Sequence, residues 1–96
     1  MTLAEVVRAK REQILEVSSR HGAYNVRVFG SLARDESGSD SDLDLLVDVG
    51  THHSPWFPAG LIADLEEILG YEVDVVTEGG LHERARAAIL EEARPL

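Results

Sequence analysis

The sequence predicts an α+β fold, a small mixed sheet covered by helices, in one domain spanning residues 1–96. A chain of 96 residues can bury one core and little more. Its apolar residues recur at helical spacing in some segments and alternate or run together in others, with Gly and Pro between those segments. The predicted order is helix, strand, short helix, strand, helix, strand, helix, which is typical of helices packed on a sheet.

The first predicted helix runs from Thr2 to about His21, because its apolar residues recur near every third or fourth position. Thr2 and Glu5 fit a capping box at its start, and Gly22 suits its end. Asn25–Phe29 is predicted as a strand with its two valines on one face.

The middle of the chain alternates turns and strands. Leu32–Glu36 is predicted as a short helix and Ser37–Ser41 as a turn. Asp42–Val49 is predicted as a strand that is largely buried after its first residues, because its apolar residues are almost continuous. Gly50–Pro58 is predicted as a loop punctuated by its prolines.

The last part of the chain is predicted to hold two helices and one strand. Ala59–Leu69 has the apolar spacing of a helix, and Gly70 follows as its end signal. Tyr71–Val76 is predicted as the third strand. The last predicted helix runs from about Leu81 to Ala93, and Pro95 terminates it.

The composition restricts the partners that we expect. The formal net charge is −9, from 18 acids against 9 Lys and Arg, which argues against direct binding to nucleic acid and suits a basic protein partner or simple solubility. There is no cysteine. We find no signal pattern and no apolar run near the ~18 residues of a membrane span, so we expect a cytoplasmic protein without membrane attachment.

One short stretch suits the binding of a nucleoside triphosphate. Gly30–Ser31 is followed by ten residues and then by Asp42-Leu43-Asp44. Gly30 lets the backbone approach a phosphate closely because it has no Cβ. Ser31 offers a hydroxyl where a helix is expected to begin, and free N–H groups there favour anions. Arg34 can add a charged donor, so the predicted nucleotide-binding residues are Gly30, Ser31 and Arg34.

Three acids form the second half of the candidate site. Asp42 and Asp44 are two residues apart in a predicted strand and therefore project from the same face, and Asp74 lies in another predicted strand. Two unit charges ~6 Å apart repel by about 2–3 kcal/mol at an effective dielectric constant near 20, and a bound divalent cation reverses that sign. Two such cations suit nucleotidyl transfer. We therefore predict Asp42, Asp44 and Asp74 as the catalytic and metal-binding residues.

Taken singly, each of these residues has an ordinary explanation. A lone Asp can be a solvated strand residue, Ser31 can cap a helix, and Arg34 can form a common salt bridge. Asp74 is harder to explain in this way, because it lies between two valines, where an unpaired acid is costly. The joint pattern favours a functional site.

The predicted loop leaves two further alternatives open. His52–His53 could bind a metal or belong to an exposed polar loop. Trp56 and Phe57 could make lid or core contacts, or could form an exposed surface for a partner. The sequence lacks the residues of an EF-hand loop, a P-loop or a zinc-protease helix.

The chain resembles the minimal nucleotidyltransferase family of the DNA polymerase beta-like superfamily over nearly its whole length. The matching segments are Phe29–Arg34, Ser41–Val47, Val73–Thr77 and the tail, Leu81–Arg84 with Ile89–Leu96. The resemblance implies the nucleotidyltransferase (polymerase beta-like) fold. Members of this family are stand-alone catalytic domains, usually paired with a small helical HEPN protein in prokaryotic toxin–antitoxin pairs, as in MntA-type antitoxins.

The resemblance further implies specific roles. It implies magnesium, as two ions, at Asp42, Asp44 and Asp74, ATP as substrate, and triphosphate contacts at Gly30 and Ser31. It implies transfer of AMP from ATP to a tyrosine of a HEPN ribonuclease toxin, which neutralises the toxin, with Asp74 helping to deprotonate the acceptor. The chain departs from the family at Asp35, where many relatives carry Gly, and this adds negative charge near the proposed phosphate site.

Three functions remain in competition. The first is a catalytic antitoxin that adenylylates its toxin, and the second is an antitoxin that neutralises by binding alone. The third is a nucleotidyltransferase that modifies a small molecule, for which the chain is too short to build a pocket unaided. The nucleotide base, the acceptor and the oligomeric state stay open.

Overall fold

The computed structural model describes residues 2–34 and 42–96. The helices are α1 (Leu3–Ala9), α2 (Arg11–Arg20), α3 (Ala59–Leu69), the 3-10 helix η1 (Glu78–Gly80) and α4 (Glu83–Glu92), and the strands are β1 (Ala23–Phe29), β2 (Leu43–Val49), β3 (Val73–Thr77) and β4 (Arg94–Pro95). The predicted turn at Ser37–Ser41, the end of the predicted helix at Leu32–Glu36, and Asp35 lie outside the described residues. Residues 31–34 form a turn, in which the Arg34 N–H donates to Gly30 O at 3.2 Å.

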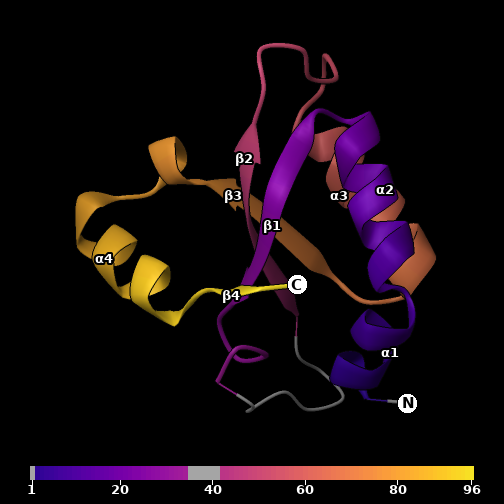
Figure 1. The fold of residues 1–96 in the computed structure, drawn as a ribbon, viewed down its shortest axis with the longest axis horizontal. Helices are drawn as coiled ribbons and strands as arrows, with labels where there is room; N and C mark the ends of the chain where they lie inside the picture. Colours follow the sequence, from indigo (N-terminus) through magenta and orange to yellow (C-terminus); the bar gives the residue numbers. More distant parts are fainter. Residues whose placement is uncertain (1, 35–41) are drawn as a thin grey trace.

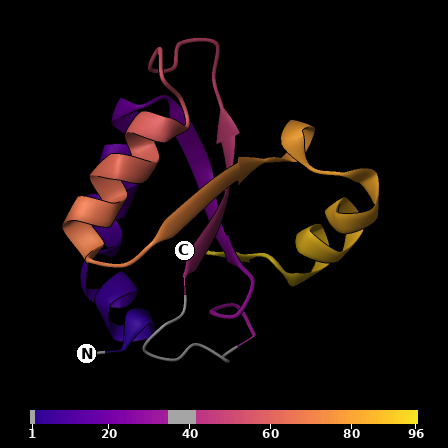
Figure 2. The same ribbon diagram turned by 180° about the vertical axis from the view of Figure 1, so that it is seen from behind.

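The four strands form one mixed sheet in the order β3-β2-β1-β4. β1 pairs antiparallel with β2 and with β4, whereas β2 and β3 are parallel. Figures 1 and 2 show α2 and α3 side by side on one side of the sheet and α4 on the other. The predicted α+β class is therefore confirmed. No helix in the described ranges is long and apolar enough to cross a bilayer.

The core lies between the sheet and the α1–α3 side. Alternate strand residues enter it, as the predicted strand pattern requires, and they pack against the apolar faces of the helices; the strand members are Val26, Val28, Leu43, Leu45, Val47, Val73 and Val75, together with Ala23, which precedes an irregularity in the pairing of β1. Since neighbouring side chains on a strand point to opposite faces, the residues between them face away from α2 and α3. Asp44 and Asp74 belong to that second face, which α4 also borders.

The prediction of one helix from Thr2 to His21 is wrong, because the helix breaks at Lys10. Lys10 has φ −109° and ψ 16°, and its ammonium group donates to Ile68 O at 2.6 Å, at the end of α3. The apolar spacing continues across the break, which is why the sequence predicted a single helix. Both predicted ends are confirmed: the Thr2 hydroxyl accepts from the Glu5 N–H, and Gly22 follows the last turn with φ +86°.

The end of the chain also differs from its prediction. Pro95 does not simply terminate a helix, because Arg94–Pro95 pairs with β1 opposite Arg27 and Val28. The Leu96 N–H then donates to Val26 O at 3.1 Å. A two-residue strand that contains proline has no period-two pattern, so it left no signal in the sequence.

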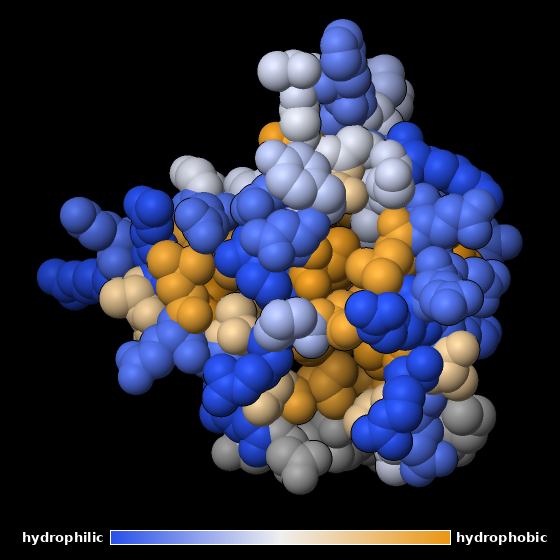
Figure 3. Space-filling view, in the orientation of Figure 1, coloured by the Kyte–Doolittle hydropathy of each residue, from blue (hydrophilic) through white to orange (hydrophobic). Residues whose placement is uncertain are grey.

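Helices lie on both faces of the sheet, and α4 covers the second face only in part. α4 has no fully buried residue, and Leu90 is 38% exposed. In Figure 3, hydrophobic surface remains visible between α4 and the α1–α2 side, framed by hydrophilic residues. On this second face Asp74 is exposed, Asp44 is partly buried and Leu46 is fully buried.

A buried hydroxyl in α2 gives a test of this packing. Ser18 is 0% exposed, and its Oγ has no hydrogen-bond partner among the described residues. Ser18→Ala removes an unsatisfied buried polar group and increases helix propensity. We expect the free energy of unfolding to rise by about 1 kcal/mol, measured by urea denaturation, whereas the exposed Ser19→Ala should change it by less than about 0.5 kcal/mol. Destabilisation by Ser18→Ala would show that the hydroxyl has a partner.

Candidate functional site

Gly30 brings the backbone against a carboxylate. It has φ +77°, and a Cβ built on it would lie 2.3 Å from Asp44 Oδ2. The preceding residue, Phe29, pairs with Asp44 across β1 and β2. The turn therefore begins directly beside Asp44. Only glycine fits this close approach without displacement of the Asp44 side chain.

Asp44 and Asp74 are neighbours because β2 and β3 pair in parallel with these two residues in register. Asp42 precedes β2 and is exposed. Burial is the main cause that raises the pKa of Asp44 above its ordinary value of 3.8, and the negative charges of Asp74 and then Asp42 raise it further. The structure thus brings all three predicted acids within electrostatic reach of one another.

Arg34 counters part of this negative charge. Its guanidinium group lowers the pKa of Asp44, whereas Glu92 of α4 acts in the opposite direction. Arg34 also forms an ion pair with Glu92 through Nη1 and Oε1. The salt-bridge alternative is therefore realised, at a position that is also close to the acids. Ser31, partly buried, stands in the turn rather than at the start of a regular helix.

The carboxylate oxygens of the three acids suit a hard cation that also binds waters and substrate phosphates. Within residues 2–34 and 42–96, no three His, Asp or Glu side chains converge into a preassembled metal centre. The oxygen donors of Asp42, Asp44 and Asp74 are of the kind that magnesium accepts, and magnesium commonly binds only one or two carboxylates together with waters and substrate phosphates. The repulsion that raises the pKa of Asp44 is what a cation would relieve, so these residues fit such an ion.

A second polar cluster was not predicted from the sequence. The His21 ring lies between Ser54 and Asp64, with Nδ1 2.8 Å from the Ser54 hydroxyl and Nε2 2.7 Å from the Asp64 carboxylate. The Ser54 N–H donates to His21 O, and Ser54 O accepts from the Phe57 N–H. These contacts tie α2, the loop after β2 and α3 together. Partners 33 and 43 residues apart share no local sequence signal, and their geometry gives the cluster a structural role.

The remaining loop residues are only partly as expected. His52 and His53 are exposed, as in the polar-loop alternative. Phe57 packs against the core, whereas Trp56 is 80% exposed. A core position for Trp56 is therefore wrong, because the chain turns just before α3 and leaves the indole outside.

The contact between Gly30 and Asp44 predicts an unusually costly substitution. Gly30→Ala adds both strain at positive φ and a clash, and we expect it to lower the free energy of unfolding by about 2–4 kcal/mol. Gly70 provides a matched control, because it has φ +73° but no atom within 4 Å of the position that a Cβ would take. Gly70→Ala should cost only about 1–2 kcal/mol. Equal losses in urea denaturation would show that the Asp44 contact is unimportant.

The raised pKa of Asp44 predicts a stability that depends on pH. Between 3.8 and the raised value, the folded state binds more protons than the unfolded state, so the free energy of unfolding falls as pH rises, and the penalty persists above that window. Asp44→Asn removes the penalty. In metal-free buffer, we expect this variant to have a higher Tm than the parent at neutral pH and no advantage below pH 3.8.

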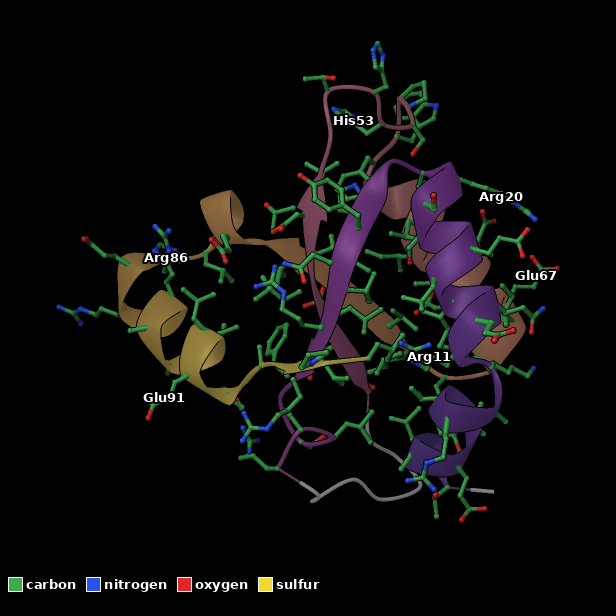
Figure 4. All side chains as sticks on the ribbon, in the orientation of Figure 1. Arg11, Arg20, His53, Glu67, Arg86 and Glu91 are labelled. Carbon is green, nitrogen blue, oxygen red and sulfur yellow. The ribbon has the colours of Figure 1, made fainter. Side chains whose placement is uncertain are left out.

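The control for this measurement is Glu67→Gln. Glu67 is an exposed acid on α3, and its side chain points to solvent on the side of the molecule away from α4 (Figure 4). The substitution removes the same charge away from the cluster. An equal rise in Tm for both variants would assign the effect to net charge instead of to the acids at the site.

Comparisons with known proteins agree with this geometry. The profile of the nucleotidyltransferase domain family matches residues 10–96. A candidate protein adenylyltransferase of Methanocaldococcus jannaschii is 39% identical over 83 residues, which cover 86% of this chain and 89% of the relative. The protein adenylyltransferase MntA of Thermococcus cleftensis is 34% identical over 92 residues, which cover 96% of this chain and 93% of the relative.

Solved structures give the same family. The structure of a candidate minimal nucleotidyltransferase matches with a TM-score of 0.86 and 50% identity, covering 100% of this chain and 97% of that one. A toxin–antitoxin structure with AMP-PNP matches with a TM-score of 0.75 at 16% identity, covering 88% and 69%, and so shares the fold. The chain therefore belongs to the nucleotidyltransferase domain family, and it is a minimal nucleotidyltransferase enzyme.

Proposed function

We propose that this chain is a magnesium-dependent antitoxin that transfers AMP from ATP to a tyrosine of a HEPN ribonuclease toxin. The observation that carries the proposal is the in-register pair Asp44 and Asp74, set beside the Gly30 turn on the second face of the sheet. Relatives of similar length are named as protein adenylyltransferases. Structures that share the fold are described as toxin–antitoxin complexes.

Each site residue has a role in this proposal. Asp42, Asp44 and Asp74 would hold two magnesium ions, and such ions would supply neutralisation of phosphate charge and activation of the attacking oxygen. The turn from Gly30 to Arg34 contacts the triphosphate through Gly30, Ser31 and the Arg34 guanidinium group. A bond forms between the acceptor oxygen and the α-phosphorus as the bond to pyrophosphate breaks. Asp74 is exposed on the edge strand β3, and in this proposal it assists loss of the acceptor proton.

A partner protein would supply the acceptor. In the described part of the chain, α4 is the helix that borders the second face (Figure 1), and Asp42 and Asp74 are exposed while Asp44 is partly buried. A tyrosine presented by another protein can reach this face without an additional domain. The net charge of −9 suits a partner with a basic surface and disfavours direct binding to nucleic acid.

The test is transfer of label from α-labelled ATP to the cognate toxin in the presence of magnesium. We expect label on the toxin, loss of at least about 100-fold in Asp42→Asn or Asp44→Asn, and loss on addition of EDTA. Substitution of the acceptor tyrosine by phenylalanine in the toxin should also abolish labelling. Absence of labelling with wild-type protein, while the Asp variants still neutralise the toxin, would falsify the proposal.

An antitoxin that acts by binding alone is the second candidate. It is favoured by the net charge of −9, which suits a basic protein partner without any catalytic step. The same variants separate the two functions. Neutralisation that survives in Asp44→Asn supports binding alone, and neutralisation that is lost while the complex still forms supports catalysis.

A further inference from the structure

The last turn of α4 brings a fourth carboxylate to the edge of the candidate site. Glu92 is the last residue of the helix, and its Oε1 contacts Nη1 of Arg34. Arg34, Ala88, Glu91 and Glu92 line one hollow between this helix and the turn after β1. Glu92 also adds to the causes that raise the pKa of Asp44. A carboxylate from the end of the chain thus reaches the turn that starts the site.

The backbone around Glu92 is fixed on both sides of the helix. Two residues later, Arg94 pairs with Val28 of β1, the strand that leads into Gly30. At the other end of α4, Arg86 lies 3.7 Å from Glu78, and Glu78 pairs with Arg27 of β1 at 3.2 Å. The Arg27 side chain is only 13% exposed. Helix α4 is therefore attached to β1 before and after its length.

Arg34 is the more exposed member of the pair. Its side chain is 50% exposed, against 21% for Glu92. A long exposed arginine loses substantial rotamer entropy when it is ordered by a ligand. A guanidinium group is a rigid plane with five N–H donors, so a contact through Nη1 orients the whole plane before a ligand arrives.

We propose that Glu92 is a positioning residue that holds the Arg34 guanidinium group in place for the phosphates of the nucleotide. The inference rests on the proposed function, because it takes ATP as the ligand of Arg34. Glu92 has no contact with the reacting atoms and acts through Arg34. It therefore makes the C-terminal helix a functional part of the nucleotide site.

Loss of the Glu92 charge and loss of its contact with Arg34 should change the affinity for the nucleotide in opposite directions. Glu92 is negative and lies near the acids, so loss of its charge alone should tighten binding of an anionic nucleotide. Loss of the contact that orders Arg34 should instead weaken binding. Glu91 offers the matched control for charge: it is the adjacent acid and lines the same hollow, but its carboxylate makes no ion pair among the described residues, and its side chain points away from the sheet (Figure 4).

The experiment measures ATP binding by calorimetry in the presence of magnesium chloride. We expect Glu92→Gln to weaken binding by roughly tenfold, the equivalent of one charge-assisted hydrogen bond, and Glu91→Gln to leave it equal or slightly tighter. In an Arg34→Ala background, Glu92→Gln should cause no further loss. Binding by Glu92→Gln that equals or exceeds the parent overturns the proposal.

Two further measurements separate loss of Arg34 positioning from a general loosening of α4 and from a lack of ATP binding. A general loosening of α4 would weaken binding in the Arg34→Ala background as well, so an additive loss there also overturns a positioning role. If the wild-type protein binds no ATP, the proposed function fails, and NMR relaxation of the Arg34 Nε–H group still tests the inference. Greater mobility in Glu92→Gln but not in Glu91→Gln supports it, and equal mobility overturns it.

Discussion

The parallel pairing of β2 with β3 is the constraint on which the site depends. It places Asp44 beside Asp74 in register, although like charges at adjacent positions oppose folding. Burial adds to this cost, since both burial and the neighbouring acids raise the pKa of Asp44. A sequence that only had to fold would place one of these acids elsewhere, so their pairing indicates a ligand that compensates the charge.

The two faces of the sheet differ in what they carry: one packs into the core, and the other carries the acids of the candidate site. Leu43, Leu45 and Val47 enter the core beneath α2 and α3, and that face supplies the apolar burial that holds the chain together. The alternate residues of the same strands carry the acids on the other face. Because a strand has a period of two, the pattern that fixes the core also points Asp44 and Asp74 to the opposite face, where Asp74 is exposed and Leu46 is fully buried.

Much of this arrangement could be predicted from local patterns. The bounds of α3 agree with the prediction to the residue, because its apolar spacing is bracketed by Pro58 and Gly70. Gly30, Asp42 and Asp44 were identifiable because they stand close together in the sequence. Their proximity to Asp74 depends on the pairing of β2 with β3. Two apolar strands suggest that they pair, but their sequences do not determine which residues lie opposite each other. The features that escaped prediction depend on contacts between distant residues, such as the break at Lys10, which involves Ile68 at a separation of 58 residues.

The position of β4 also explains how the end of the chain reaches the turn from Gly30 to Arg34. Arg94 and Pro95 pair with the middle and end of β1, so the residues before them must lie near the exit of that strand. Gly30 to Arg34 begins at the same exit. The short antiparallel pairing at the end of the chain thus brings Glu92 to Arg34, and sheet topology, not local sequence, determines which acid faces the only arginine of the turn.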